Sequence, residues 1–154
     1  MPEQMSQDLW DELNDKAKTT DPAVSMQCQL PDGEYLCVCN DVGVKVITEK
    51  AVMYWSMQVT EDDPSGLAGE DGSEFEHVRW LTGSDSTFGI ALAMGDVVRM
   101  GIAKITLNEI RDNEEQPWPA IVELAKQTGV GKTMKVRVVT NDQGYKNTAI
   151  VGVV

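Results

Sequence analysis

Residues 51–59 read AVMYWSMQV, in which a wholly apolar set of side chains alternates with a mixed set. A period of two is typical of a β-strand with one buried face. The apolar set predicts the core face, and it consists of Ala51, Met53, Trp55, Met57 and Val59. Tyr54, Ser56 and Gln58 are expected on the opposite face.

Strands are predicted on both sides of this stretch. In residues 34–47 the even positions from Leu36 to Val46 are apolar, interrupted by Asn40, and indicate one long half-buried strand with a bulge or bend at Gly43. In residues 75–81 Val78 and Trp80 share one face, and Phe75, His77 and Arg79 share the other, which we expect to face outward. Two strands end the chain, over residues 132–140 and 145–154, and in the first of them Lys135 and Arg137 point outward.

Helices are predicted in three places. Ser6 can N-cap a helix to about residue 18 whose apolar stripe contains Leu9, Trp10 and Leu13. Residues 88–102 favour a broken helix at best, because three glycines interrupt them, and residues 117–129 favour a helix that begins with proline and ends at Gly129.

This order predicts a mainly β chain with α-helices: a five-stranded OB-fold barrel with a helical insertion between strands 3 and 4 and an N-terminal helix. A small open sandwich would give much the same pattern. Residues 1–29 are interpreted as an acidic N-terminal helix and linker, and residues 30–154 as the OB-fold domain. At 154 residues the chain has the size of one domain.

The charge is unevenly distributed. The net charge is -12, and residues 61–76 hold seven acids and no base. Residues 131–154 carry four bases against one acid. An acidic chain therefore contains one basic segment, the kind of patch that single-stranded nucleic acid prefers.

The motifs of common enzymes are missing, and we expect no catalytic activity, cofactor or metal. The segment GVGKT at residues 129–133 lacks the first glycine of a P-loop and follows a helix instead of a strand. His77 is the only histidine and is expected to be structural or at the surface, and the three cysteines fit no zinc pattern. With no leader and no long apolar run, the chain is expected in the cytoplasm, without a membrane.

A basic strip and an aromatic platform together predict a surface for single strands. Tyr54 and Phe75 would stack on bases, and phosphates would be contacted by Arg79, Lys132, Lys135, Arg137 and Lys146.

Four blocks carry a family resemblance: LPDGEYLCVCNDVGVKV at residues 30–46, MYWSMQV at 53–59, VRWLTG at 78–83, and residues 123–154. They resemble the phage-encoded OB-fold proteins that bind single-stranded DNA. The resemblance implies sequence-independent binding during phage DNA replication or recombination, in the host cytoplasm, without catalysis or metal. It leaves the oligomeric state open.

One departure from that family keeps a second hypothesis open. Such proteins often end in an acidic tail that recruits replication partners, whereas here the acids lie near the N-terminus and in residues 61–76. The chain could instead be a non-catalytic, acidic protein-interaction module on the same fold, or a mimic of nucleic acid. Such a module would act through its acidic N-terminal helix or the loop at residues 61–76. For the DNA-binding hypothesis, replication or recombination proteins would bind the acidic N-terminal segment.

Overall fold

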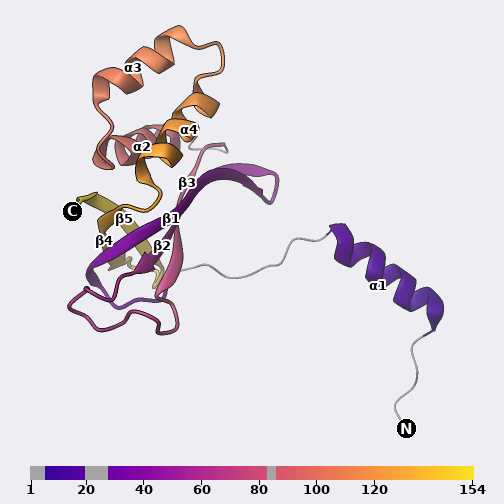
Figure 1. Ribbon diagram of the computed structural model, residues 1–154. Helices are drawn as coiled ribbons and strands as arrows, with labels where there is room; N and C mark the ends of the chain where they lie inside the picture. The colour runs from indigo at the N-terminus through magenta and orange to yellow at the C-terminus, as the bar shows by residue number, and fades with distance from the viewer. Residues whose placement is uncertain (1–5, 20–27, 83–85) are drawn as a thin grey trace.

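The computed structural model describes residues 6–19, 28–82 and 86–154. In these residues a long β-meander precedes three helices, and two further strands follow (Figure 1). The elements are α1 (Gln7–Thr19), β1 (Gly33–Ile47), β2 (Lys50–Val59), β3 (Glu74–Trp80), α2 (Ser86–Arg99), α3 (Lys104–Asn113), α4 (Pro117–Gly129), β4 (Thr133–Thr140) and β5 (Lys146–Val153). The expected order of strands and helical insertion is confirmed.

The strands form one antiparallel sheet in the order β3-β2-β1-β4-β5. Among the described residues no backbone ladder joins the edge strands β3 and β5, so the sheet is open and a closed barrel is not confirmed. The two edges still meet through side chains, because His77 Nδ1 on β3 lies 2.7 Å from Thr148 Oγ1 on β5.

The inner face of the sheet carries the core. Trp55, Met57 and Val59 on β2 are buried as expected, and so are Met134, Val136 and Val138 on β4. Both strands alternate a uniformly apolar face with a mixed or charged face, so only one orientation can bury apolar surface. The predicted orientation of β2 and β4 is therefore confirmed.

The predicted orientation of β1 is wrong at every even-numbered apolar position except Val42, and near the end of the strand Val44 and Val46 are 42% and 71% exposed. Tyr35, Cys37 and Cys39 are buried, whereas the even-numbered Leu36 and Val38 are only partly buried. The register shifts between Cys39 and Asp41, and this β-bulge turns Val42 back to the core. The sequence suggested a bulge at Gly43, whereas the bulge lies earlier in the strand, between Cys39 and Asp41.

The helical insertion lies together at one end of the sheet (Figure 1), where α4 contacts β1 and α2 contacts β3 and β5. Helix α2 continues through Gly89 and Gly95 and ends at Arg99, so of the three expected interruptions only the one at Gly101 occurs. The helix α3 was not anticipated. Gly89 has a packing role: a Cβ there would lie 1.8 Å from the Trp80 carbonyl oxygen. The glycine lets α2 approach the end of β3.

The N-terminal helix forms as the sequence indicates. The Ser6 hydroxyl accepts a hydrogen bond from the Leu9 backbone N–H at 3.2 Å, which is an N-cap. In Figure 1 α1 stands apart from the sheet. The core begins slightly before the expected boundary at residue 30, because Cys28 is buried together with Leu30.

Candidate nucleic-acid interface

The outer face of β4 carries the expected basic strip. Lys135 and Arg137 point away from the core, with side chains 47% and 52% exposed, and Lys132 is exposed just before the strand. Glu34 on the neighbouring strand β1 lies between them: Arg137 Nη2 donates to its Oε1 at 2.8 Å, and Lys135 Nζ is 3.9 Å from its Oε2. The structure therefore brings Lys135 and Arg137 together and adds one carboxylate.

Lys146 at the start of β5 is not part of this strip: it pairs with Thr140, which has the parity of the inward residues Val136 and Val138. Its Nζ donates to Asp32 Oδ1 at 3.2 Å, and the same oxygen accepts the Thr140 hydroxyl at 2.6 Å. The Thr140 hydrogen bonds, with help from Lys146, lower the pKa of Asp32. The Arg137 hydrogen bond likewise lowers the pKa of Glu34. Both acids are charged at neutral pH, so Glu34 offsets part of the positive field of Lys135 and Arg137, and Asp32 that of Lys146.

Tyr54 lies on the outer face of β2, as expected, and is partly exposed. Its hydroxyl donates to Asp41 Oδ2 at 3.1 Å, and Lys45 Nζ is 5.0 Å from the ring centroid. A Cβ on Gly43 would lie 2.7 Å from the Tyr54 hydroxyl, so the ring crosses the glycine closely. Burial, followed by the Asp41 contact, raises the pKa of Tyr54. Tyr54, one aromatic residue of the predicted platform, is therefore on the outer face, although its hydroxyl is bonded to Asp41 and Lys45 lies over its ring.

The expectation that Phe75, His77 and Arg79 face outward is wrong. Phe75 and His77 are 0% exposed, because the register pairs them with the inward residues Met57 and Trp55. Cross-strand partners in an antiparallel sheet share a face. Phe75 therefore has no surface on which a base could stack.

Arg79 is held by a buried carboxylate. Asp96 on α2 is 0% exposed and accepts hydrogen bonds from Arg79 Nε at 2.7 Å and from Arg79 Nη2 at 3.3 Å. Its Oδ2 is also 2.7 Å from His77 Nε2. Burial raises the pKa of Asp96, but the hydrogen bonds and charges of His77 and Arg79 lower it by more than burial raises it. The pKa of Asp96 is therefore below its ordinary value. Asp96, His77 and Arg79, the Asp96 cluster, join α2 to β3, and Arg79 is committed to it.

Two exposed aromatic residues were missed. Trp80 at the end of β3 is 45% exposed, with Lys50 Nζ 6.0 Å from its ring centroid. Tyr145 in the β4–β5 loop is 60% exposed and directly precedes Lys146. The sequence could have indicated that Tyr145 is exposed, because it directly follows the turn at residues 141–144. Nothing in the sequence indicated that Trp80 is exposed, because its orientation depends on the register of β3.

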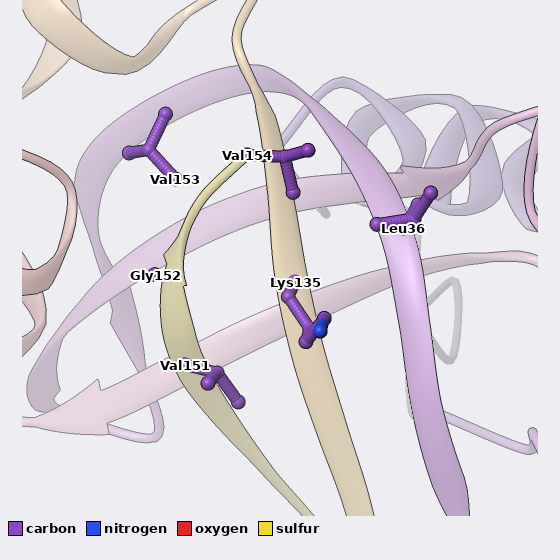
Figure 2. A pocket seen from close by; sticks show the side chains of 6 residues that line it. All are labelled: Leu36, Lys135, Val151, Gly152, Val153 and Val154. Atoms are coloured by element: carbon purple, nitrogen blue, oxygen red, sulfur yellow. The ribbon is translucent and has the colours of Figure 1, made fainter.

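A shallow groove of about 310 Å³ lies at the far end of the basic strip (Figure 2). Its lining residues are Leu36, Lys135, Val151, Gly152, Val153 and Val154. A Cβ on Gly152 would meet no atom within 4 Å, so the groove is open there. It is apolar apart from Lys135.

Within the described residues no group of three or more His, Cys, Asp and Glu side chains is placed to hold a metal ion. None of the helices in the same part of the chain is long and apolar enough to cross a membrane. The segment at residues 129–133 contains the end of α4 and the start of β4, as the sequence indicated. No family model matches the chain, and no curated protein matches it.

Proposed function

We propose that this protein binds single-stranded DNA, independently of sequence, along the outer face of β4 and the β4–β5 loop. The observation that carries the proposal is the pair of outward cations Lys135 and Arg137 on β4, with the exposed Lys132 just before the strand and the exposed ring of Tyr145, next to Lys146 in sequence, in the β4–β5 loop. Cations that follow a backbone, next to aromatic rings, suit single strands of any sequence.

The strand arrangement supports the same function. A five-stranded, partly open barrel of the OB type binds oligonucleotides on strands 2 and 3 and on the loops joining strands 1–2 and 4–5. The contact of 2.7 Å between His77 and Thr148, across the open edges, supports such a partly open barrel. Tyr54 and Trp80 on strands β2 and β3, and Tyr145 on the β4–β5 loop, are the proposed stacking residues. We place this activity in phage DNA replication or recombination, in the host cytoplasm and without catalysis.

Salt titration of a labelled 30-mer of oligo-dT, followed by fluorescence anisotropy, tests the proposal. Contacts with three or four phosphates predict a log-log salt slope of roughly -2 to -3, at about -0.7 per phosphate. Lys135→Ala and Arg137→Ala should each flatten the slope by about 0.7. Lys104→Ala is the matched control, because Lys104 is an exposed lysine at the start of α3, away from the strip.

Two variants of Tyr145 test the contribution of base stacking separately from that of charge. Tyr145→Ala should weaken binding about 5- to 150-fold, since one stacked base contributes on the order of 1–3 kcal/mol. Tyr145→Phe keeps the ring and should bind like the wild type. Absence of binding to the 30-mer at 50 mM salt, or equal affinity of both Tyr145 variants, contradicts the proposal.

A second candidate function is favoured by α1. Its side chains Leu9, Trp10 and Leu13 lie along one stripe, and each is about half exposed. An amphipathic helix with such a stripe is a common recognition element that enters an apolar groove. If DNA binding fails, a protein-interaction module acting through α1 is the alternative.

A further inference from the structure

The apolar stripe of α1 is a surface without a described contact. The helix has 13 residues, a length at which an isolated helix is only marginally stable in water. Most helical stability in proteins comes from packing an apolar face, yet Leu9, Trp10 and Leu13 each expose nearly half of their surface. A helix of this kind gains most from a complementary groove.

The chain carries such a groove. Leu36, Val151 and Val154 supply apolar walls, the floor is open at Gly152, and the volume of about 310 Å³ has room for one indole ring (Figure 2). Val151 and Val154 are 39% and 71% exposed, so the apolar walls of the groove are open to water. Groove and stripe are both apolar surfaces open to water.

Charge complementarity supports the match. The groove is bordered by Lys135, and Arg137 follows on the same face of β4. Helix α1 carries Asp8 and Asp11 in the turn that holds Trp10, and the whole segment of residues 1–34 is acidic. A carboxylate beside Lys135 would add a favourable contact, and the ammonium could also lie over the indole face.

The chain length allows the contact within one molecule. Eight residues separate Thr19 from Cys28, and when extended they span at most about 29 Å. Leu36 follows Leu30 by six residues, so it lies within roughly 20 Å of it. A short linker gives the tethered helix an effective concentration in the millimolar range, well above that of a second copy.

We infer that α1 docks into the groove formed by β1, β4 and β5 of its own chain, with Trp10 seated beside Lys135. The inference does not rest on DNA binding. In the docked state the helix covers the end of the basic strip, and the apolar surface of both partners leaves water.

Amide hydrogen exchange of the full chain tests this inference. Docking should slow exchange in residues 9–15 roughly tenfold relative to variants that spoil the groove. The variants are Val151→Asp and Lys135→Glu, which change the groove and leave the helix sequence intact. Their matched controls, Ile105→Asp and Lys104→Glu, place the same acidic side chains at exposed positions of α3.

The expected result is slow exchange in the wild type and in both controls, and fast exchange in both groove variants. If Val151→Asp melts at a much lower temperature, Lys135→Glu, a surface substitution, still tests the contact. Equal exchange in the wild type and in the groove variants overturns the inference. Protection that falls on tenfold dilution also overturns it, because the occupant is then the helix of a second copy.

Discussion

Replacing Asp96 by asparagine is the sharpest test of what holds the open sheet and its helices together. The carboxylate of Asp96 is fully buried between α2 and β3 and accepts hydrogen bonds from His77 Nε2 and Arg79 Nε, both at 2.7 Å. Asparagine has nearly the same volume, so Asp96→Asn leaves no cavity. It removes the charge and places an amide N–H₂ group where an acceptor is needed.

The magnitude follows from the burial of the cluster. Removing one partner of a buried ion pair destabilises a protein by about 3–5 kcal/mol, because the other charge stays buried and unpaired. Arg79 is only 18% exposed, so water compensates little. For a chain of this size the loss corresponds to a fall in melting temperature of roughly 6–20 °C.

Urea denaturation followed by circular dichroism measures the loss directly. Asp112→Asn is the matched control: Asp112 pairs with Arg111 at 3.0 Å, but both side chains are more than half exposed. Such an exposed pair contributes at most about 1 kcal/mol. Equal stability of the two variants would refute the role assigned to the Asp96 cluster.

The pH dependence provides a second readout. Because the pKa of Asp96 is lower in the folded than in the unfolded chain, its contribution to stability is complete above the ordinary carboxyl pKa of about 3.9. The contribution is lost as the pH falls through the folded value. The stability gap between the wild type and Asp96→Asn should therefore narrow as the pH falls below about pH 4. If the stability difference between the wild type and Asp96→Asn does not narrow in acid, the ionised carboxylate of Asp96 is not the source of that difference.

Three further predictions concern packing, thiol chemistry and the N-terminal segment. Gly89→Ala should destabilise the protein by at least about 1–3 kcal/mol, because its Cβ would lie 1.8 Å from the Trp80 carbonyl oxygen, whereas Gly152→Ala, with open space around it, should be neutral in the same urea titration. Burial, together with the charge of Asp63, raises the pKa of Cys37 to about 12, so a thiol reagent at pH 8 should label Cys37 slowly in the native protein and rapidly after denaturation. Deleting residues 1–19 should leave cooperative unfolding intact and raise the affinity for oligo-dT several-fold, because an acidic segment no longer competes for the strip; loss of cooperative unfolding, or unchanged affinity, would count against this expectation.

The candidate site was predictable in part. Lys135 and Arg137 could be placed outward because their neighbours on β4 are uniformly apolar and leave one way to bury the strand. Tyr54 followed from the same argument on β2. The acids that pair with these cations, Glu34 with Lys135 and Arg137 and Asp32 with Lys146, could not be assigned, since their proximity depends on the register between β1 and β4 and on the turn before β1.

The sequence by itself determined the five strands and the helices α1 and α4, and on β2 and β4 it also determined which face is buried. Only the tertiary structure decided the orientation of β3 and of the first half of β1. Both stretches carry apolar residues on both faces, so alternation does not distinguish the two orientations. On β3 the choice depends on Asp96, nineteen residues along the chain from His77, because only its carboxylate lets His77 be buried and Arg79 point inward. On β1 it depends on a bulge that shifts the alternation between Cys39 and Asp41, and the buried partners on both sides fix the place of that bulge.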